Sequence, residues 1–295
     1  MIVTVASGKG GTGKTTVAVS LALAVASQDD GGKAGGNGAR TVLLDCDVEE
    51  PNAHLFLKPD IQHRREVGVL TPVVDEARCT HCRRCAEVCA YHAIAVLADQ
   101  VLIFSELCHG CGSCALNCPE NAIREALRVT GVIEEGSAGE IDFAHGVLNV
   151  GEAMGVPVIR ELKKRIVKGA DETLVILDAP PGTSCPMVAC LSGVDYALMV
   201  TEPTPFGLHD LKLAVRVARD ELKLPVGVVI NRDGTGDRGV DEYCQAEGIP
   251  ILMRIPLDRR IAEVCSEGVP LVSALPRYRQ RFLTLYHRIR QEAGR

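Results

Sequence analysis

The residues Gly8-Lys9-Gly10-Gly11-Thr12-Gly13-Lys14-Thr15-Thr16 decide the fold of this chain. Their spacing, G-x-x-x-x-G-K-T, predicts a loop whose backbone N–H groups surround phosphate oxygens at the start of a helix. Lys14 would neutralise the charge of the β- and γ-phosphates, and the Thr15 hydroxyl would hold Mg²⁺. The apolar residues 1–6 and 17–26 predict the strand before this loop and the buried helix after it.

Beyond this loop, short β-rich apolar runs alternate with helix-like stretches. The runs lie at residues 41–44, 173–177, 196–200, 226–230 and 249–252, and the helix-like stretches at 161–167, 208–222 and 258–265. This alternation predicts an α/β fold with a mostly parallel, doubly wound sheet covered by helices on both faces. Polar residues at the ends of the strands would line one edge of the sheet, where such folds bind ligands; they are Asp45, Asp178, Glu202 and Asn231.

An internal repeat interrupts the alternation between about residues 70 and 130. Four cysteines recur 29 positions later in the chain, Cys79, Cys82, Cys85 and Cys89 as Cys108, Cys111, Cys114 and Cys118. Repetition at a fixed spacing indicates a duplicated structural unit. We therefore predict an inserted domain over residues 71–130 in a larger domain formed by residues 1–70 and 131–295.

The spacing C-x2-C-x2-C-x3-C, present twice, is typical of 4Fe-4S sites. Three thiolates on one tight loop reach three corners of a cluster, and duplicated units exchange their fourth cysteines. One cluster is expected on Cys79, Cys82, Cys85 and Cys118, and the other on Cys108, Cys111, Cys114 and Cys89. Zinc is the main alternative, because paired C-x2-C motifs also bind it. The third cysteine at the same gap, the duplication and Pro119 favour iron.

The cysteine unit resembles bacterial ferredoxins that carry two 4Fe-4S clusters. Ala90 departs from that pattern, because proline usually follows the fourth cysteine. The departure removes no ligand but changes the surroundings of the second cluster.

Composition argues against several classes of partner. The chain of 295 residues has a formal net charge of −6, 3% aromatic residues and no tryptophan, which argues against a nucleic-acid-binding surface. It contains no apolar run long enough to span a membrane, and its apolar start leads into the glycine loop without a cleavage site. With cysteines at metal-ligand spacing, we expect a cytoplasmic protein.

The basic amphipathic stretch 276–295 could bind a membrane surface, but packing on the core is the favoured interpretation. The glycine-rich residues 29–38 predict a surface loop to which we assign no function.

Lys9, an additional lysine in the glycine loop, makes the sequence resemble the deviant Walker A superfamily of MinD, ParA and the nitrogenase iron protein. The resemblance implies an ATPase that binds ATP or ADP with Mg²⁺ between two subunits of a homodimer. Lys9 would act on the partner subunit's nucleotide. The family pattern also assigns Asp47 to the switch I acid that positions water, Asp178 to Walker B and Asn231 to the adenine edge. Asp45 is either a further acid of the site or a helix cap.

The whole chain resembles MinD-superfamily ATPases with an inserted ferredoxin domain, through the segments 45–52, 178–186 and 201–210. Three functions are compatible with this resemblance. The first is a nucleotide-dependent dimer that couples its ATP state to electron transfer toward an unidentified partner. The second is an iron–sulfur assembly or carrier ATPase, although the C-terminal C-x-x-C of Mrp-type carriers is missing. The third is a positioning or scaffold ATPase that senses redox state.

Cys185 lies seven residues after Asp178, where the nitrogenase iron protein has a cluster ligand. The resemblance implies that two copies of Cys185 in a dimer, with Cys190 nearby, could hold a bridging cluster. The competing interpretation is a buried free cysteine that acts as a small apolar residue.

Overall fold

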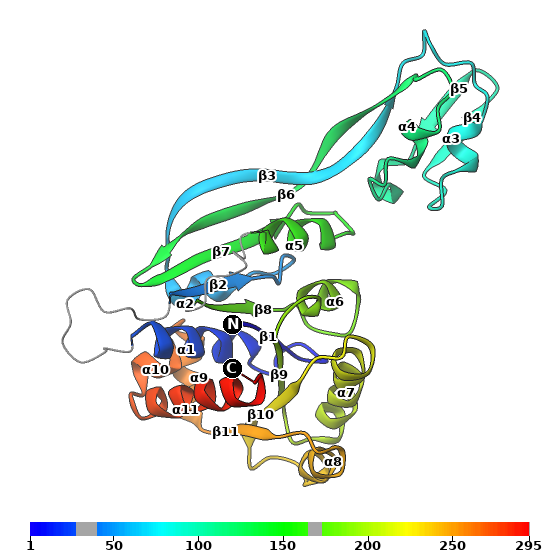
Figure 1. The fold of residues 1–295 in the computed structure, drawn as a ribbon. Helices are drawn as coiled ribbons and strands as arrows, with labels where there is room; N and C mark the ends of the chain where they lie inside the picture. The colour runs from blue at the N-terminus through cyan, green and yellow to red at the C-terminus, as the bar shows by residue number, and fades with distance from the viewer. Residues whose placement is uncertain (28–39, 165–172, 295) are drawn as a thin grey trace.

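The computed structural model describes residues 1–27, 40–164 and 173–294, and it contains one large sheet (Figure 1). The strand order is β11-β10-β9-β1-β8-β2-β7-β6-β3. The bounds are β1 Ile2–Ala6, β2 Thr41–Asp45, β3 Asp60–Val74, β6 Ile123–Ala138, β7 Ile141–Leu148, β8 Leu174–Asp178, β9 Tyr196–Thr201, β10 Val226–Asp233 and β11 Ile251–Pro256. The seven strands from β11 to β7 are parallel, whereas β6 and β3 pair antiparallel. The prediction of a mostly parallel α/β sheet is confirmed.

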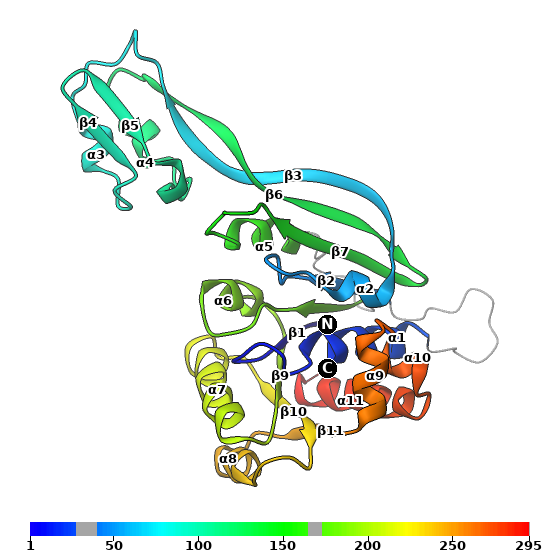
Figure 2. The same cartoon turned by 180° about the vertical axis from the view of Figure 1, so that it is seen from behind.

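Helices cover both faces of the sheet (Figures 1 and 2). The helices of the main body are α1 Lys14–Ala26, α2 Ala53–Leu57, α5 Val156–Lys163, α6 Cys185–Leu191, α7 Pro205–Val215, α8 Gly239–Glu247, α9 Arg259–Ser266, α10 Leu271–Ala274 and α11 Arg277–Glu292. A wider π-helical turn, η2 Arg216–Glu221, continues α7. One core lies between the sheet and α1, α10 and α11, and a second lies between the sheet and α5 to α8.

The C-terminal helix α11 packs on the first core, as the sequence predicts. Phe282, Leu285, Tyr286 and Ile289 are all buried there. In the part of the chain that the structure describes, no helix has the length and apolarity needed to cross a bilayer.

The predicted elements in the main body are present, with small shifts at their ends. The helix expected at 161–167 begins earlier, at Val156, and the last three residues of that prediction lie outside the described part of the chain. The glycine-rich residues 29–38 also lie outside it. Three strands, β3, β6 and β7, were not expected from the sequence.

β3 and β6 form a long two-stranded arm that carries the cysteine unit at its tip (Figures 1 and 2). They pair from Asp60–Ser137 to Val74–Ile123, whereas β7 pairs with β6 only over residues 131–138. Residues 68–74 therefore extend the arm about 20 Å past the end of β7, at about 3.3 Å per residue. Since β3 runs in the direction of the parallel strands, the arm projects from the edge at which those strands end. The predicted domain boundaries fall inside β3 and β6.

A glycine shapes the base of the arm. The pairing register shifts between Val67 and Gly68, as in a β-bulge. A Cβ atom at Gly68 would lie 1.9 Å from the carbonyl oxygen of Arg128, so a larger residue does not fit. The close approach of the two backbones at this bulge depends on glycine.

The tip of the arm consists of two similar halves. The first contains the end of β3, helix α3 Arg84–Glu87 and strand β4 Ile94–Leu97. The second contains β5 Gln100–Ile103, the short 3₁₀ turn η1 Ser105–Leu107, helix α4 Ser113–Leu116 and the start of β6. β4 and β5 form a separate antiparallel hairpin. The spacing of 29 residues in the sequence thus corresponds to a repeated β–loop–helix–β unit.

Candidate functional site

The glycine loop lies between β1 and α1, as predicted, and α1 begins at Lys14. Gly13 adopts a left-handed conformation with φ +91°, and a Cβ there would lie 2.4 Å from the side-chain nitrogen of Asn231. That nitrogen donates a hydrogen bond of 2.8 Å to the carbonyl oxygen of Thr12. In this structure Asn231 therefore holds the loop against the end of β10.

Two neighbouring strands bring the acidic residues to the same edge. Asp45 and Asp178 end β2 and β8 at paired positions, and the Cys46 N–H donates to the Asp178 carbonyl oxygen at 2.9 Å. Asp178 is buried, and in the described chain neither of its carboxylate oxygens makes a well-formed hydrogen bond. Burial, reinforced by Asp45, raises the pKa of Asp178 well above its ordinary value.

This unsatisfied carboxylate fits a divalent cation. Mg²⁺ binds through one or two carboxylates together with phosphate and water oxygens. The Thr15 hydroxyl lies near Asp178 and lowers the pKa of that carboxyl, against the larger effect of burial. Thr15 and Asp178 are therefore suited to hold Mg²⁺ in the way that the sequence motif predicts.

The Asp45 carboxylate is held by backbone hydrogen bonds. It accepts backbone N–H bonds from Asp47 at 3.1 Å and from Asn52 and Ala53 at 2.9 Å. These bonds order the turn that leads into α2, which favours the capping interpretation of Asp45. Asp47 is less enclosed; burial and the charge of Asp45 raise its pKa to about 6, while Lys14 acts in the opposite direction.

Lys14 is the central cation among these acids. It is 7% exposed, and burial lowers its pKa although Asp178, Asp47 and Asp45 raise it. Beside three acids, Lys14 alone supplies little net positive charge for a phosphate group, and a bound Mg²⁺ would add to it.

The side chain of Lys9 contacts a different acid from the three that surround Lys14. Its Nζ lies 3.1 Å from Glu202 at the end of β9, and the same carboxylate also pairs with Arg232. Glu202 is only 8% exposed. The sequence identified Glu202 as a strand-end acid, but its contact with Lys9 spans 193 residues and could not be predicted. No sequence signal pointed to Arg232.

The cysteine unit has matching geometry in its two halves. The Asp75 N–H donates to the Ala122 carbonyl at 2.7 Å, and 29 residues later the Phe104 N–H donates to Ala93 at 2.9 Å. Left-handed residues also recur at this spacing, namely His81 and Gly110, Arg83 and Gly112, and His92 and Asn121. The two loops therefore present their cysteines in the same backbone conformation.

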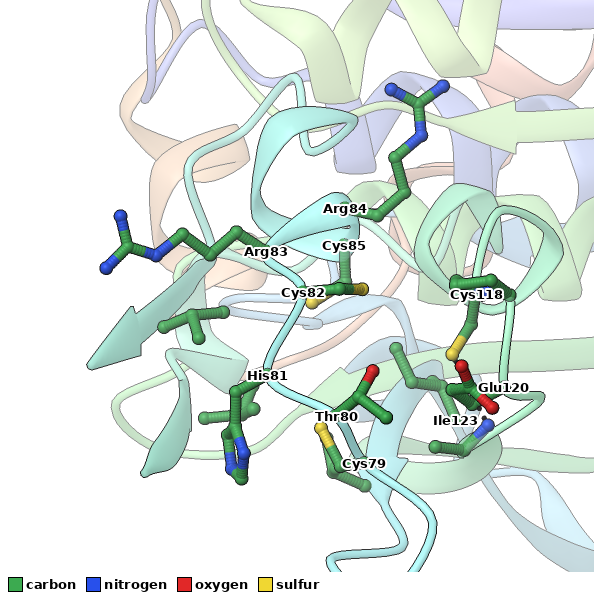
Figure 3. Close-up of a pocket in the computed structure, with 15 residues that line it drawn as sticks. Cys79, Thr80, His81, Cys82, Arg83, Arg84, Cys85, Cys118, Glu120 and Ile123 are labelled. Carbon is green, nitrogen blue, oxygen red and sulfur yellow. Dashed lines mark hydrogen bonds between the residues drawn. The ribbon is translucent and has the colours of Figure 1, made fainter. Parts of the chain in front are cut away.

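Two cavities lie beside these loops, enclosing about 370 and 360 Å³ with their open mouths included. Each is lined by three cysteines of one half and the last cysteine of the other. The first cavity has Cys79, Cys82, Cys85 and Cys118, and the second has Cys108, Cys111, Cys114 and Cys89. Figure 3 shows the four labelled cysteines of the first cavity around one space. These are the exchanged sets that the sequence predicts.

No three His, Cys, Asp or Glu side chains within residues 1–27, 40–164 and 173–294 converge closely enough to hold a single metal ion. The cysteines are instead spread around the cavities, and the two clusters stay a prediction. The fourth cysteine of each half already accepts a backbone N–H bond at 3.3 Å, Cys89 from Ala93 and Cys118 from Ala122. Such N–H···S bonds are typical of the surroundings of cluster thiolates.

Cys185 is exposed at the start of α6, so the interpretation as a buried cysteine is wrong. It lines an open groove with Arg160 and Lys163 of α5. Cys190 is buried, and its thiol lies close enough to Cys46 to raise the pKa of the Cys46 thiol. The structure therefore does not present Cys190 beside Cys185 at the surface.

The comparisons with known proteins agree with this geometry. Residues 3–271 match the family described as CobQ/CobB/MinD/ParA nucleotide binding domain. The chain belongs to this nucleotide-binding family. Its phosphate loop and mostly parallel sheet are therefore those of a nucleotide-binding domain of this family.

An uncharacterized protein of Methanocaldococcus jannaschii is 32% identical over 269 residues, which cover 91% of this chain and 90% of that protein. An iron-sulfur cluster carrier protein of Synechocystis is 24% identical; the match covers 93% of this chain and 65% of the carrier. Among solved structures, MinD with Mg-ADP from Pyrococcus horikoshii has a TM-score of 0.59 at 20% identity, covering 99% of this chain and 97% of that one. This likeness shows the fold alone.

Proposed function

We propose that the protein is an ATP-dependent homodimer that couples its nucleotide state to two 4Fe-4S clusters for electron transfer to a partner. The observation that carries the proposal is the lining of the two cavities by the exchanged cysteine sets, at the tip of an arm that projects from the nucleotide edge. The bacterial-ferredoxin pattern of the cysteines supports the same assignment. The inserted domain of residues 71–130 remains part of this proposal.

At the nucleotide edge, Lys14 and the backbone of residues 8–16 hold the phosphates, and Thr15 and Asp178 hold Mg²⁺. Asp47 orients the attacking water, and Lys9 leaves Glu202 to reach the nucleotide of the partner subunit. Dimerisation across this edge places the arm of each subunit alongside its partner, because the arm extends past the ends of the parallel strands. The nucleotide state thereby decides what can approach the cysteine unit.

A chain of polar contacts links the nucleotide edge to the arm. His145 of β7 affects the pKa of Asp45, and its Nε2 lies 2.8 Å from Glu134 of β6. Glu134 also pairs with Arg64 of β3 at 3.4 Å. The buried His145 is paired with Asp45 across β2 and β7, so it lies between the nucleotide edge and the base of the arm, and movement of the acids would reach the arm by this route.

When bound, each cluster supplies one-electron redox chemistry. The experiment is electron paramagnetic resonance of anaerobically purified, reduced protein with and without a non-hydrolysable ATP analogue and Mg²⁺. We expect cluster signals in both samples, with a changed line shape or relaxation when nucleotide is bound. The Lys14→Ala variant is the control and should not respond. Identical spectra in the wild type would contradict the coupling.

A second candidate is an iron–sulfur carrier, favoured by the Synechocystis relative and by an iron-sulfur cluster carrier protein of Aquifex aeolicus, 32% identical over 117 residues. That match covers 35% of this chain and 32% of the Aquifex protein. In a carrier, the exposed Cys185 would hold a transferable cluster. Transfer of iron and sulfide to an apo-ferredoxin, abolished by Cys185→Ser, would favour the carrier; retention of eight irons during incubation would favour electron transfer.

A further inference from the structure

The two halves of the cysteine unit differ in charge although their backbones match. Three arginines flank the loop of the first cavity, whereas the positions 29 residues later are uncharged. The pairs are Arg78 and Leu107, Arg83 and Gly112, and Arg84 and Ser113. Arg83 and Arg84 line the first cavity, and Gly112 and Ser113 line the second. The first half also has three acids opposite uncharged residues, Asp75, Glu76 and Glu87 against Phe104, Ser105 and Leu116, so the two halves differ in where the positive charge lies: only the first has arginines at its cavity.

Arg83 occupies a conformation that suits glycine. Its φ of +67° is close to the φ of +71° at Gly112, its counterpart in the other half. A left-handed conformation costs a residue with a side chain about 1 kcal/mol or more. Non-glycine residues held in such conformations cluster at functional sites. An arginine therefore stands in the first half where the second half has the less strained glycine.

The arginines remain available to a partner. In the described chain no carboxylate forms an ion pair with Arg83, and the contact of Arg84 with Glu87 at 3.4 Å is an exposed surface pair. Such pairs contribute little and are easily exchanged. Arg78 donates to the carbonyl oxygen of Glu120, which leaves its charge unneutralised. Figure 3 shows Arg83 and Arg84 extending to opposite sides of the loop that carries the exposed Cys82.

The face of the second half is apolar instead. Leu107 is 52% exposed and Leu116 is 86% exposed. The second cavity is lined by Glu125 and by no arginine or lysine. The first cavity is lined by Arg83, Arg84 and Glu120, so an anionic protein would meet a net positive lining there and a net negative one at the second cavity.

We propose that Arg78, Arg83 and Arg84 form a docking surface for an acidic one-electron carrier protein, which meets the cluster held by Cys79, Cys82, Cys85 and Cys118. The proposal rests on the proposed function. One electron passes between carrier and cluster, so one is oxidised and the other reduced by a single electron, with no bond made or broken. Because the whole chain is acidic, with a net charge of −6, its remaining surface disfavours such a carrier, and the arginines orient it.

The test measures binding of oxidised flavodoxin, a small acidic one-electron carrier, to the anaerobically purified protein by calorimetry at low and at physiological salt. The variant Arg78→Gln/Arg83→Gln/Arg84→Gln should bind roughly tenfold more weakly at low salt and lose most of the salt dependence. The control Arg259→Gln/Arg260→Gln/Arg290→Gln removes the same charge from exposed positions of the main body and should bind like the wild type.

Iron and sulfide content is measured on every sample. Two outcomes would overturn the docking surface and leave the proposed function intact. In one, the wild type carries its full iron and sulfide but does not bind flavodoxin; in the other, the control variant loses as much affinity as the variant of Arg78, Arg83 and Arg84. Absence of iron from the wild type would instead overturn the proposed function. The single variant Arg83→Lys keeps the charge and should retain most of the affinity, which separates loss of charge from damage to the loop.

Discussion

At the scale of single residues, burial disfavours the charged forms of the acids and of the lysine at the nucleotide edge. Burial raises the pKa of Asp178 and of Asp47 and lowers that of Lys14, so every ionised form at this edge is disfavoured by desolvation. The described contacts leave the oxygens of Asp178 unsatisfied. Such a site gains stability when Mg²⁺ and phosphate supply the missing charges and ligands.

The raised pKa of Asp47 predicts a dependence of stability on pH. Its folded-state pKa of about 6 lies above the ordinary value of 3.8, so the folded chain binds this proton more tightly than the unfolded chain does. Its contribution is present at low pH and is lost as the pH rises through about 6. The variant Asp47→Asn should therefore be more stable than the wild type at pH 8, with a free energy of unfolding about 1 kcal/mol higher. At pH 4 the two proteins should have the same free energy of unfolding.

Denaturant unfolding of the nucleotide-free protein from pH 4 to pH 8 measures this difference. The control is Asp60→Asn, which removes an exposed carboxylate at the start of β3. Curves for wild type and Asp47→Asn that stay parallel over the whole range would show that Asp47 titrates normally.

The contact between Lys9 and Glu202 predicts an effect on dimerisation. Glu202→Gln removes the charge that holds Lys9 within its own subunit, so Lys9 is released at lower cost. With a non-hydrolysable ATP analogue bound, we expect the dimer dissociation constant of the variant to be roughly fivefold lower than that of the wild type. This corresponds to about 1 kcal/mol in the free energy of dimerisation. Analytical ultracentrifugation gives the dissociation constant.

Arg232→Gln is the matched control, because it removes the other partner of Glu202 and leaves that carboxylate to Lys9 alone. It should weaken dimerisation. If both variants shift the dissociation constant in the same direction, the contact does not restrain Lys9.

At the scale of elements, α11 is part of the core and not a peripheral attachment. Phe282 and Ile289 are fully buried, and α11 packs against α1, the helix that begins at Lys14. Phe282→Ala should lower the free energy of unfolding by about 3 to 5 kcal/mol, since it leaves a cavity in a close-packed core. Arg290→Ala, on the exposed face, should change it by less than about 0.5 kcal/mol. Denaturant titration of both variants provides the measurement, and a small effect of Phe282→Ala would mean that α11 is detachable.

Local patterns in the sequence predicted the elements of the main body but not the arm. The buried strands are continuous apolar runs, which a reader recognises without knowing the fold. β3 begins with the exposed residues 60–66, which have no apolar run, and it is stabilised by pairing with β6 about 50 to 77 positions away. Such a strand is specified by long-range pairing, which a single sequence does not reveal.

The same distinction applies to the site. The phosphate loop and the cysteine repeats are local motifs, and the structure places Lys14 beside the acids and each exchanged cysteine set around one cavity. The restraint on Lys9 by Glu202 and the support of the loop by Asn231 join residues about 200 positions apart. Only the order of strands in the sheet brings these residues together.

At the scale of the whole molecule, the nucleotide edge and the cysteine unit are separate in their contacts. The eight predicted cluster cysteines all lie within residues 79–118, and backbone hydrogen bonds hold the two halves of that unit together. The connection to the main body runs through the pairing of β6 with β7 and through the packing of β3 and β6 on α5, where Arg65 pairs with Glu161. Assembly of the cysteine unit should therefore not depend on nucleotide.

Lys14→Ala tests this separation. Loss of the buried ammonium leaves phosphate facing Asp178, Asp47 and Asp45, so we expect nucleotide affinity to fall at least about a hundredfold. Iron and sulfide should stay at eight of each per chain in anaerobic protein, because no cysteine of the arm contacts Lys14. Calorimetry with ATP and chemical iron analysis give the two values. Joint loss of nucleotide binding and iron would mean that the arm folds only on an intact nucleotide domain, and that the two sites are one cooperative unit.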